Sequence, residues 1–120
     1  MRKLSFDWVK RTDGASEFMD FMDGLPVKDR AKLAALITAV EEHGLEIAKR
    51  MKWVKKLGDG FFEIRSRQAS DIQRVIYFHG SGKQCIITHG FTKKSDVIPK
   101  TQIERAKNLR AKWLEERGQR

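Results

Sequence analysis

Residues 57–65 read LGDGFFEIR, residues 72–79 read IQRVIYFH, and residues 89–94 read HGFTKK. All three stretches contain aromatic or β-branched residues, and apolar and polar side chains alternate in the first, as is typical of short strands. The connecting sequences 58–60 and 80–82 contain glycines, which accept the positive φ angles that tight turns require. Strands joined by such turns run antiparallel. We therefore predict a three-strand antiparallel meander that carries cations beside apolar residues.

The sequence before this meander indicates one strand followed by two helices. Residues 4–9 alternate apolar and polar side chains, as a strand does. Ser16 can cap a short helix, and Pro26 ends that helix and opens a second one, which ends at Gly44. The apolar stripes of the two helices, at helical spacing, are Phe18, Phe21, Met22 and Leu25, and then Leu33, Leu36, Ile37 and Val40.

A final helix is predicted after the meander. Pro99 precedes Thr101-x-x-Glu104, which has the pattern of a capping box. The apolar side of this helix consists of Ile103, Ala106, Leu109 and Trp113. The basic stretch 47–56 has no clear assignment. Residues 1–120 are thus expected to form a single α+β domain, with a small antiparallel sheet (an N-terminal strand plus the meander) flanked by two N-terminal helices and one C-terminal helix.

The composition indicates an intracellular protein with a polyanionic partner. Its 120 residues include 25 Lys and Arg against 16 Asp and Glu, a formal net charge of +9. Such an excess favours binding to nucleic acid, an anionic membrane or an acidic protein, although a basic protein without such a partner is the alternative. Cys85 is the sole cysteine, which excludes an intrachain disulfide, and we expect a buried thiol in a cytoplasmic protein. No apolar stretch approaches the roughly 18 residues of a membrane span, and no signal peptide is recognisable.

The alternation of side chains along a strand indicates which face each arginine occupies. Arg65 shares a face with Glu63, which on its own is compatible with a solvated strand. Arg74 shares a face with the apolar residues Ile72, Ile76 and Phe78, and Tyr77 falls on the opposite face. A cation in an apolar row is costly unless it is paired or lies at a cleft. Arg74 is therefore either the partner of Glu63 in a salt bridge or a functional residue.

Lysines surround the meander on both sides. Lys93 and Lys94 follow its last strand, where a loop begins, and loops often carry function, although a solvated turn is the simpler reading of one such pair. Lys52, Lys55 and Lys56 precede the meander. We regard Lys93 and Lys94 as candidate catalytic residues. The three lysines before the meander are candidate RNA-binding residues.

His89 shares strand parity with Cys85, Ile87 and Phe91, so it is either core or the lining of a site. The histidines have no metal-ligand spacing, and no glycine-rich phosphate loop or nucleophile elbow is recognisable. We predict no metal and no other cofactor.

A cationic sheet of this kind is suited to RNA chemistry. RNA supplies its own nucleophile in the 2′-hydroxyl. Arginines and lysines can hold the phosphate oxygens and stabilise developing charge. Tyr77 or a lysine could transfer protons, and Phe91, Tyr77 or His89 could contact a base. Charge alone would equally support passive RNA binding.

The motifs at residues 55–65, 72–78 and 89–94, followed by Pro99 and IERA at residues 103–106, resemble the RelE/ParE toxin superfamily. In particular they resemble the phage-derived HigB-like toxins of type II toxin–antitoxin systems. The similarity runs from the first predicted helix through the last. It implies a RelE-like fold and a toxin that cleaves messenger RNA on the ribosome without a metal.

The resemblance also implies roles and partners. Arg65 and Arg74 match sheet cations that contact phosphate, and Lys93 and Lys94 match a basic pair after the last strand. The expected partners are ribosomal RNA, messenger RNA and a cognate antitoxin, often a helix-turn-helix protein, with operator DNA bound only through the antitoxin complex and no membrane involved. Several relatives carry a C-terminal tyrosine. This chain has only Tyr77, which leaves the general acid and base open.

Two other functions share the fold and stay open at the level of sequence. A gyrase poison of the ParE type would bind a protein target and cleave no RNA. A degenerate toxin-fold protein would only bind its partner. Fold alone does not separate these functions, because one fold supports several activities.

Overall fold

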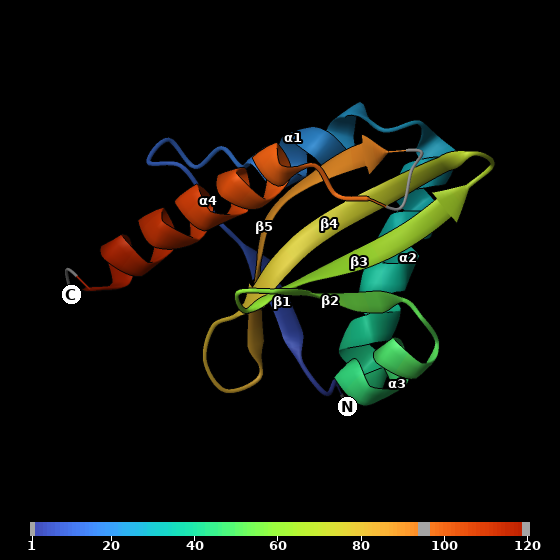
Figure 1. Cartoon of the computed structure of the whole chain (residues 1–120), viewed down its shortest axis with the longest axis horizontal. Coiled ribbons are helices and arrows are strands. Elements are labelled where there is room, and N and C mark those ends of the chain that lie inside the picture. The colour runs from blue at the N-terminus through green and yellow to red at the C-terminus, as the bar shows by residue number, and fades with distance from the viewer. Residues whose placement is uncertain (1, 94–96, 119–120) are drawn as a thin grey trace.

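A computed structural model describes residues 2–93 and 97–118, which form a mixed sheet with helices on both faces (Figure 1). The five strands are β1 (Ser5–Trp8), β2 (Val54–Gly58), β3 (Phe61–Gln68), β4 (Asp71–His79) and β5 (Gln84–Lys93). Their order in the sheet is β1-β5-β4-β3-β2. β1 runs parallel to β5, and every other neighbouring pair is antiparallel. The predicted α+β class is confirmed, and the parallel pairing of β1 makes the sheet mixed rather than wholly antiparallel as predicted.

The meander contains one strand more than predicted. The basic stretch without an assignment forms α3 (Leu45–Arg50) and then β2, which pairs with β3 through the turn at Gly58, Asp59 and Gly60. All three turn residues have positive φ, as the glycines suggested. Val54 is the one buried residue of β2, and its lysines are exposed. An edge strand with so little apolar character forms because its backbone pairs with β3, which sequence periodicity does not detect.

The ends of the N-terminal helices follow the predicted signals. The Ser16 side chain accepts a hydrogen bond from the backbone of Met19 at 3.2 Å and caps α1 (Glu17–Gly24). Pro26 immediately precedes α2 (Val27–His43), and Gly44 ends it with φ of 85°. These predictions are confirmed.

The predicted capping box of the last helix is wrong in position. α4 (Lys100–Gly118) begins directly after Pro99, so Thr101 lies inside the first turn rather than ahead of it. The carbonyl of Pro99 accepts a hydrogen bond from Gln102 at 3.0 Å, which closes that turn. None of the helices in the described ranges is both long and apolar enough to cross a membrane.

Each face of the sheet buries its own apolar cluster. α1 and α2 cover one face, where the buried residues include Phe18, Met22, Leu33, Val40, Ile64, Val75, Tyr77, Cys85 and Ile87. α4 covers part of the other face, where the cluster includes Val9, Phe61, Ile76, Phe78, Ile86 and Ala106, with Ile103, Leu109 and Trp113 packed against them. The predicted apolar side of the last helix is thus confirmed.

A β-bulge in β5 changes the predicted parity. Ile76 pairs with His89, whereas the next residue of β4, Tyr77, pairs with Ile87, so Thr88 is the extra residue of β5. Such a residue reverses the alternation of faces beyond it. Ile87 therefore faces α1 and α2, while His89 faces α4. The prediction that His89 shares a face with Cys85 and Ile87 is wrong, although its shared face with Phe91 holds.

Candidate functional site

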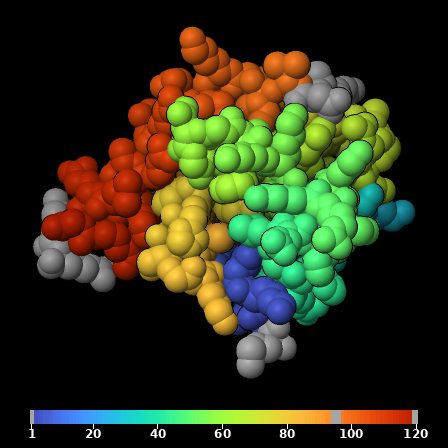
Figure 2. Space-filling model, turned by 60° about the horizontal axis from the view of Figure 1, so that its bottom comes forward, coloured from blue at the N-terminus to red at the C-terminus, as the bar shows by residue number. Residues whose placement is uncertain are grey.

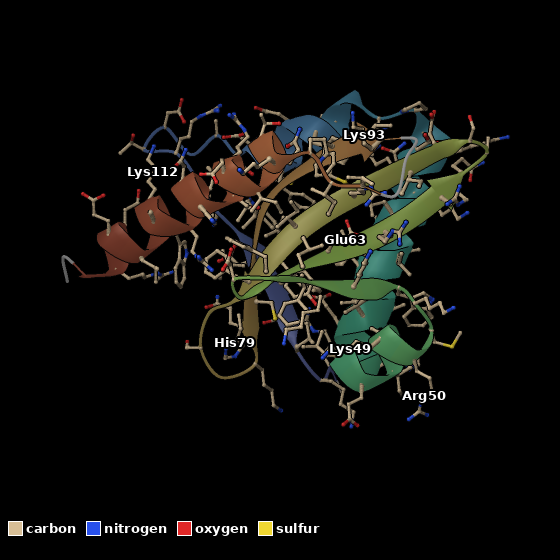
Figure 3. The ribbon with its side chains drawn as sticks, viewed as in Figure 1. Lys49, Arg50, Glu63, His79, Lys93 and Lys112 are labelled. Carbon is tan, nitrogen blue, oxygen red and sulfur yellow. The ribbon has the colours of Figure 1, made fainter. Side chains whose placement is uncertain are left out.

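The face of the sheet that α4 covers only in part carries the candidate cations. Cross-strand pairing aligns them in three rows, because paired residues point to the same side of a sheet. The rows are Lys55, Glu63, Ile76 and His89; then Arg65, Arg74 and Phe91; then Arg67, Ile72 and Lys93. We call these ten residues the cationic face. Figure 3 shows Glu63 in the middle of β3 and Lys93 at the end of β5.

A buried ion pair lies at the centre of this face. The Nη1 atom of Arg74 donates hydrogen bonds to both carboxylate oxygens of Glu63, at 3.2 and 3.1 Å. Both side chains are completely buried. The predicted salt bridge is therefore confirmed. The prediction that Arg74 itself contacts an RNA phosphate does not fit this geometry, because the side chain has no exposed surface.

Glu63 connects the buried arginine to the exposed part of the face. The Nε atom of Arg65 lies 3.4 Å from the same carboxylate, and the Arg65 side chain is 24% exposed. Burial raises the pKa of Glu63, and the nearby charges of Arg74, Arg65 and Lys55 oppose that rise. One carboxylate thus orients Arg65 at the surface while it holds Arg74 beneath. Sequence parity pointed to Glu63 only as a pairing partner.

The lysines lie around this centre. Lys55 and Lys93 are exposed on the cationic face, and Lys52 is exposed in the turn before β2. Lys55 and Lys56 border a groove of about 430 Å³ that lies between β2 and residues 97–103. In the space-filling view β2 lies between α4 and the region of α2 and α3 (Figure 2). Lys94, the other predicted catalytic lysine, lies outside the described residues.

Tyr77 is the clearest departure from the predicted site. It points to the opposite face, where its ring packs edge-on against Phe6 at 5.0 Å and stacks on Phe62 at 5.4 Å. The side chain is fully buried, and burial raises the pKa of its hydroxyl. Proton transfer to RNA and stacking on a base both require contact with RNA, which this position does not permit. We therefore remove Tyr77 from the candidate site.

His89 is buried in a polar network beside the cationic face. Its Nε2 atom lies 2.8 Å from the side-chain oxygen of Gln102, and its Nδ1 atom lies 3.1 Å from the hydroxyl of Thr88. Burial lowers the pKa of His89, while the hydrogen bond to Gln102 opposes that change. Because the amide oxygen only accepts, Nε2 carries the proton that it shares with Gln102, whereas the Thr88 hydroxyl beside Nδ1 donates to the backbone carbonyl of Ile76 at 3.2 Å. The buried ring orients Gln102, and Phe91 stacks on it at 5.9 Å.

A polar cleft opens next to His89, between β5 and the first turns of α1 and α4. Its volume is about 430 Å³, and it is lined by Glu17, His89, Gly90, Phe91, Thr101, Gln102 and Arg105. We call it the α4 cleft. Arg105 donates from Nε to Glu17 at 2.5 Å, which joins α4 to α1. Sequence reasoning missed Glu17, Gln102 and Arg105 as site residues, since only the docking of α4 brings them together.

The family model described as Phage derived protein Gp49-like (DUF891) matches residues 20–111, which include the cationic face and most of the α4 cleft. No curated protein matches the chain. Within the described residues, no group of three or more histidine, cysteine, aspartate or glutamate side chains is placed to hold a metal ion.

Proposed function

Because the chain belongs to the phage-derived Gp49-like family, which lies in the RelE/ParE toxin-like group, we propose that it is the toxin of a type II toxin–antitoxin system. In this proposal it is a HigB-like endoribonuclease that cleaves messenger RNA on the ribosome and so inhibits translation. Its partners are ribosomal RNA, translated messages and a cognate antitoxin, through which the complex binds operator DNA.

The observation that carries this proposal is the arrangement of cations on one sheet face. Lys55, Arg65 and Lys93 are at least partly exposed there, in neighbouring rows, and Glu63 holds Arg65 from below. A guanidinium fixed in this way can donate to a phosphate without reorganising, which is how an enzyme stabilises developing charge most effectively. Arg74 acts through Glu63 as a positioning residue.

The chemistry uses the 2′-hydroxyl of the RNA. The 2′-oxygen forms a bond to phosphorus, the bond to the 5′-oxygen breaks, and a 2′,3′-cyclic phosphate and a 5′-hydroxyl result. One proton leaves the 2′-oxygen and one reaches the 5′-oxygen. We assign the charge stabilisation to Arg65. Lys55 or Lys93 donates the proton that the 5′-oxygen gains, in place of Tyr77, and water accepts the proton that leaves the 2′-oxygen.

The test is a paired substitution on the cationic face. Lys55→Ala with Arg65→Ala removes two cations and leaves the Glu63–Arg74 pair in place, so we expect cleavage of translated messages to fall about 100-fold or more. Lys112→Ala, at an exposed position of α4 (Figure 3), removes a cation elsewhere and serves as the control. Growth arrest without antitoxin and mapping of 5′ ends in cellular messages provide the measurements. If the double variant folds and remains fully toxic, the proposed site is wrong.

Burial of both Arg74 and Tyr77 favours one alternative, a gyrase poison of the ParE type. These two members of the predicted catalytic set do not reach solvent. A protein that poisons gyrase would arrest growth with intact messages and a DNA-damage response. The same expression experiment therefore separates the two functions.

A further inference from the structure

The α4 cleft has polar and aromatic walls that the cleavage chemistry does not use. It lies beside the cationic face, and Phe91 belongs to both, since this residue pairs across the sheet with Arg74. A chain of RNA held by its phosphate at Arg65 would thus pass close to the cleft with an adjoining nucleotide. The volume of about 430 Å³ falls in the range of roughly 300–1,000 Å³ that small-ligand pockets occupy.

The backbone on this side of β5 is firmly held. A Cβ atom on Gly90 would lie 2.3 Å from Cδ2 of Phe21, so the helix α1 packs directly against the strand at this point. His89 is 3% exposed, with both ring nitrogens in hydrogen bonds. Because its Nε2 engages the amide oxygen of Gln102, the amino group of Gln102 is left to act as a donor elsewhere.

A carboxylate and a guanidinium stand side by side at the edge of the cleft. Both Nε and Nη2 of Arg105 contact one oxygen of Glu17, Oε1, at 2.5 Å. A carboxylate has a second oxygen and a guanidinium a second amino group, so each can also serve a ligand. The side chain of Glu17 is 22% exposed and that of Arg105 is 56% exposed, which leaves both accessible.

The carboxylate of Glu17 beside the guanidinium of Arg105 favours binding of a neutral base in the cleft over binding of a phosphate. The negative charge of Glu17 would repel a phosphate in the cleft. Guanine instead presents the N1–H donor beside the O6 acceptor, so the second oxygen of Glu17 can accept from N1 while the second amino group of Arg105 donates to O6. Adenine places an amino group where guanine has O6, so it would set a donor against Arg105. The ring of Phe91 supplies a surface on which a base can stack.

We propose that the α4 cleft is a guanine-binding site, with Glu17 and Arg105 reading the base edge and Phe91 stacking on it. This inference rests on the proposed function, and it gives the cleavage a preference for messages with a guanine next to the cut. His89 and Gln102 act as positioning residues, because they hold the wall of the cleft rather than read the base.

Binding of nucleotides to the intact protein tests the site without any cleavage. Guanosine, adenosine, cytidine and uridine monophosphates are titrated while amide NMR signals of Gly90, Thr101 and Gln102 are followed. We expect the guanosine nucleotide to bind on the order of 10-fold more tightly than the others. Glu17→Gln should abolish this preference. Glu104→Gln, an equivalent change at an exposed position of α4 outside the cleft, should retain it.

The outcomes separate this inference from the proposed function. Equal binding of all four nucleotides, or a guanine preference that survives Glu17→Gln, overturns the guanine site even if the protein cleaves messages. Selective guanine binding that Glu17→Gln removes supports the site, and it does so even for a protein that leaves messages intact, in which case only the nuclease function fails. Thermal unfolding of Glu17→Gln confirms that the variant is folded.

Discussion

Replacement of Glu63 by glutamine tests the central ion pair most directly. The substitution keeps the shape of the side chain but removes the charge that accepts two hydrogen bonds from Arg74. Both groups are completely buried, so water cannot replace the lost interaction. Removal of one partner of a buried pair typically lowers the free energy of unfolding by about 3–5 kcal/mol. That is a large part of the roughly 5–15 kcal/mol by which domains are stable.

The assay is urea denaturation of the purified protein, with the free energy of unfolding extrapolated to zero denaturant. Asp59→Asn is the matched control. It removes a carboxylate from an exposed ion pair with Lys107 at 3.4 Å, and asparagine accepts the φ of 54° at that position. An exposed pair of this kind contributes only about 0–1 kcal/mol.

The double variant Glu63→Leu with Arg74→Met distinguishes a lost charge pair from general disruption. Apolar replacement of both partners is often neutral or stabilising, so we expect it to recover most of the loss. If Glu63→Gln costs no more than Asp59→Asn, or if the double variant is less stable than the single one, the reasoning about this pair is refuted.

Three further substitutions test other parts of the structure. Tyr77→Phe removes a buried hydroxyl that has no hydrogen-bond partner among the described residues, so the free energy of unfolding should rise by about 1 kcal/mol with toxicity unchanged; a loss of toxicity would restore Tyr77 to the site. Burial lowers the pKa of His89 below the ordinary value of about 6.5, so the unfolded chain binds more protons and stability should decrease as the pH falls below that value. Denaturation at pH 7.5 and 5 should show this decrease, and His89→Gln should reduce it. Gly90→Ala should lower the free energy of unfolding by about 1–3 kcal/mol through its clash with Phe21, whereas Gly24→Ala, with open space around it, should not.

Local signals in the sequence correctly indicated most of the fold. Ser16, Pro26 and Gly44 mark helix ends through their own side chains or backbone preferences, so their effect depends little on distant parts of the chain. The same is true of the turn at Gly58 and Gly60. β2 was not predicted, because its two lysines interrupt the apolar pattern that indicates a strand. It forms by pairing with β3, and this pairing is not visible in the sequence of β2 alone.

The candidate site was only partly predictable for a similar reason. Strand parity placed Arg74 on the correct face and suggested Glu63 as its partner, because alternation is a local property. Parity did not reveal that the pair is completely buried, since burial depends on how the strands and helices pack. It also failed beyond Thr88, because a bulge forms through pairing between two strands.

The sequence by itself determined the class of the fold, the positions of the main helices and the strands that carry Arg65, Arg74 and Lys93. These follow from periodicity, turn chemistry and charge, which act over a few residues. The tertiary structure decided which cations reach solvent, buried Tyr77 against Phe6 and Phe62, and brought Glu17 and Arg105 together across 88 positions of the chain. Such contacts depend on the packing of α1 and α4 against β5, and packing is a property of surfaces that meet only when the chain has folded.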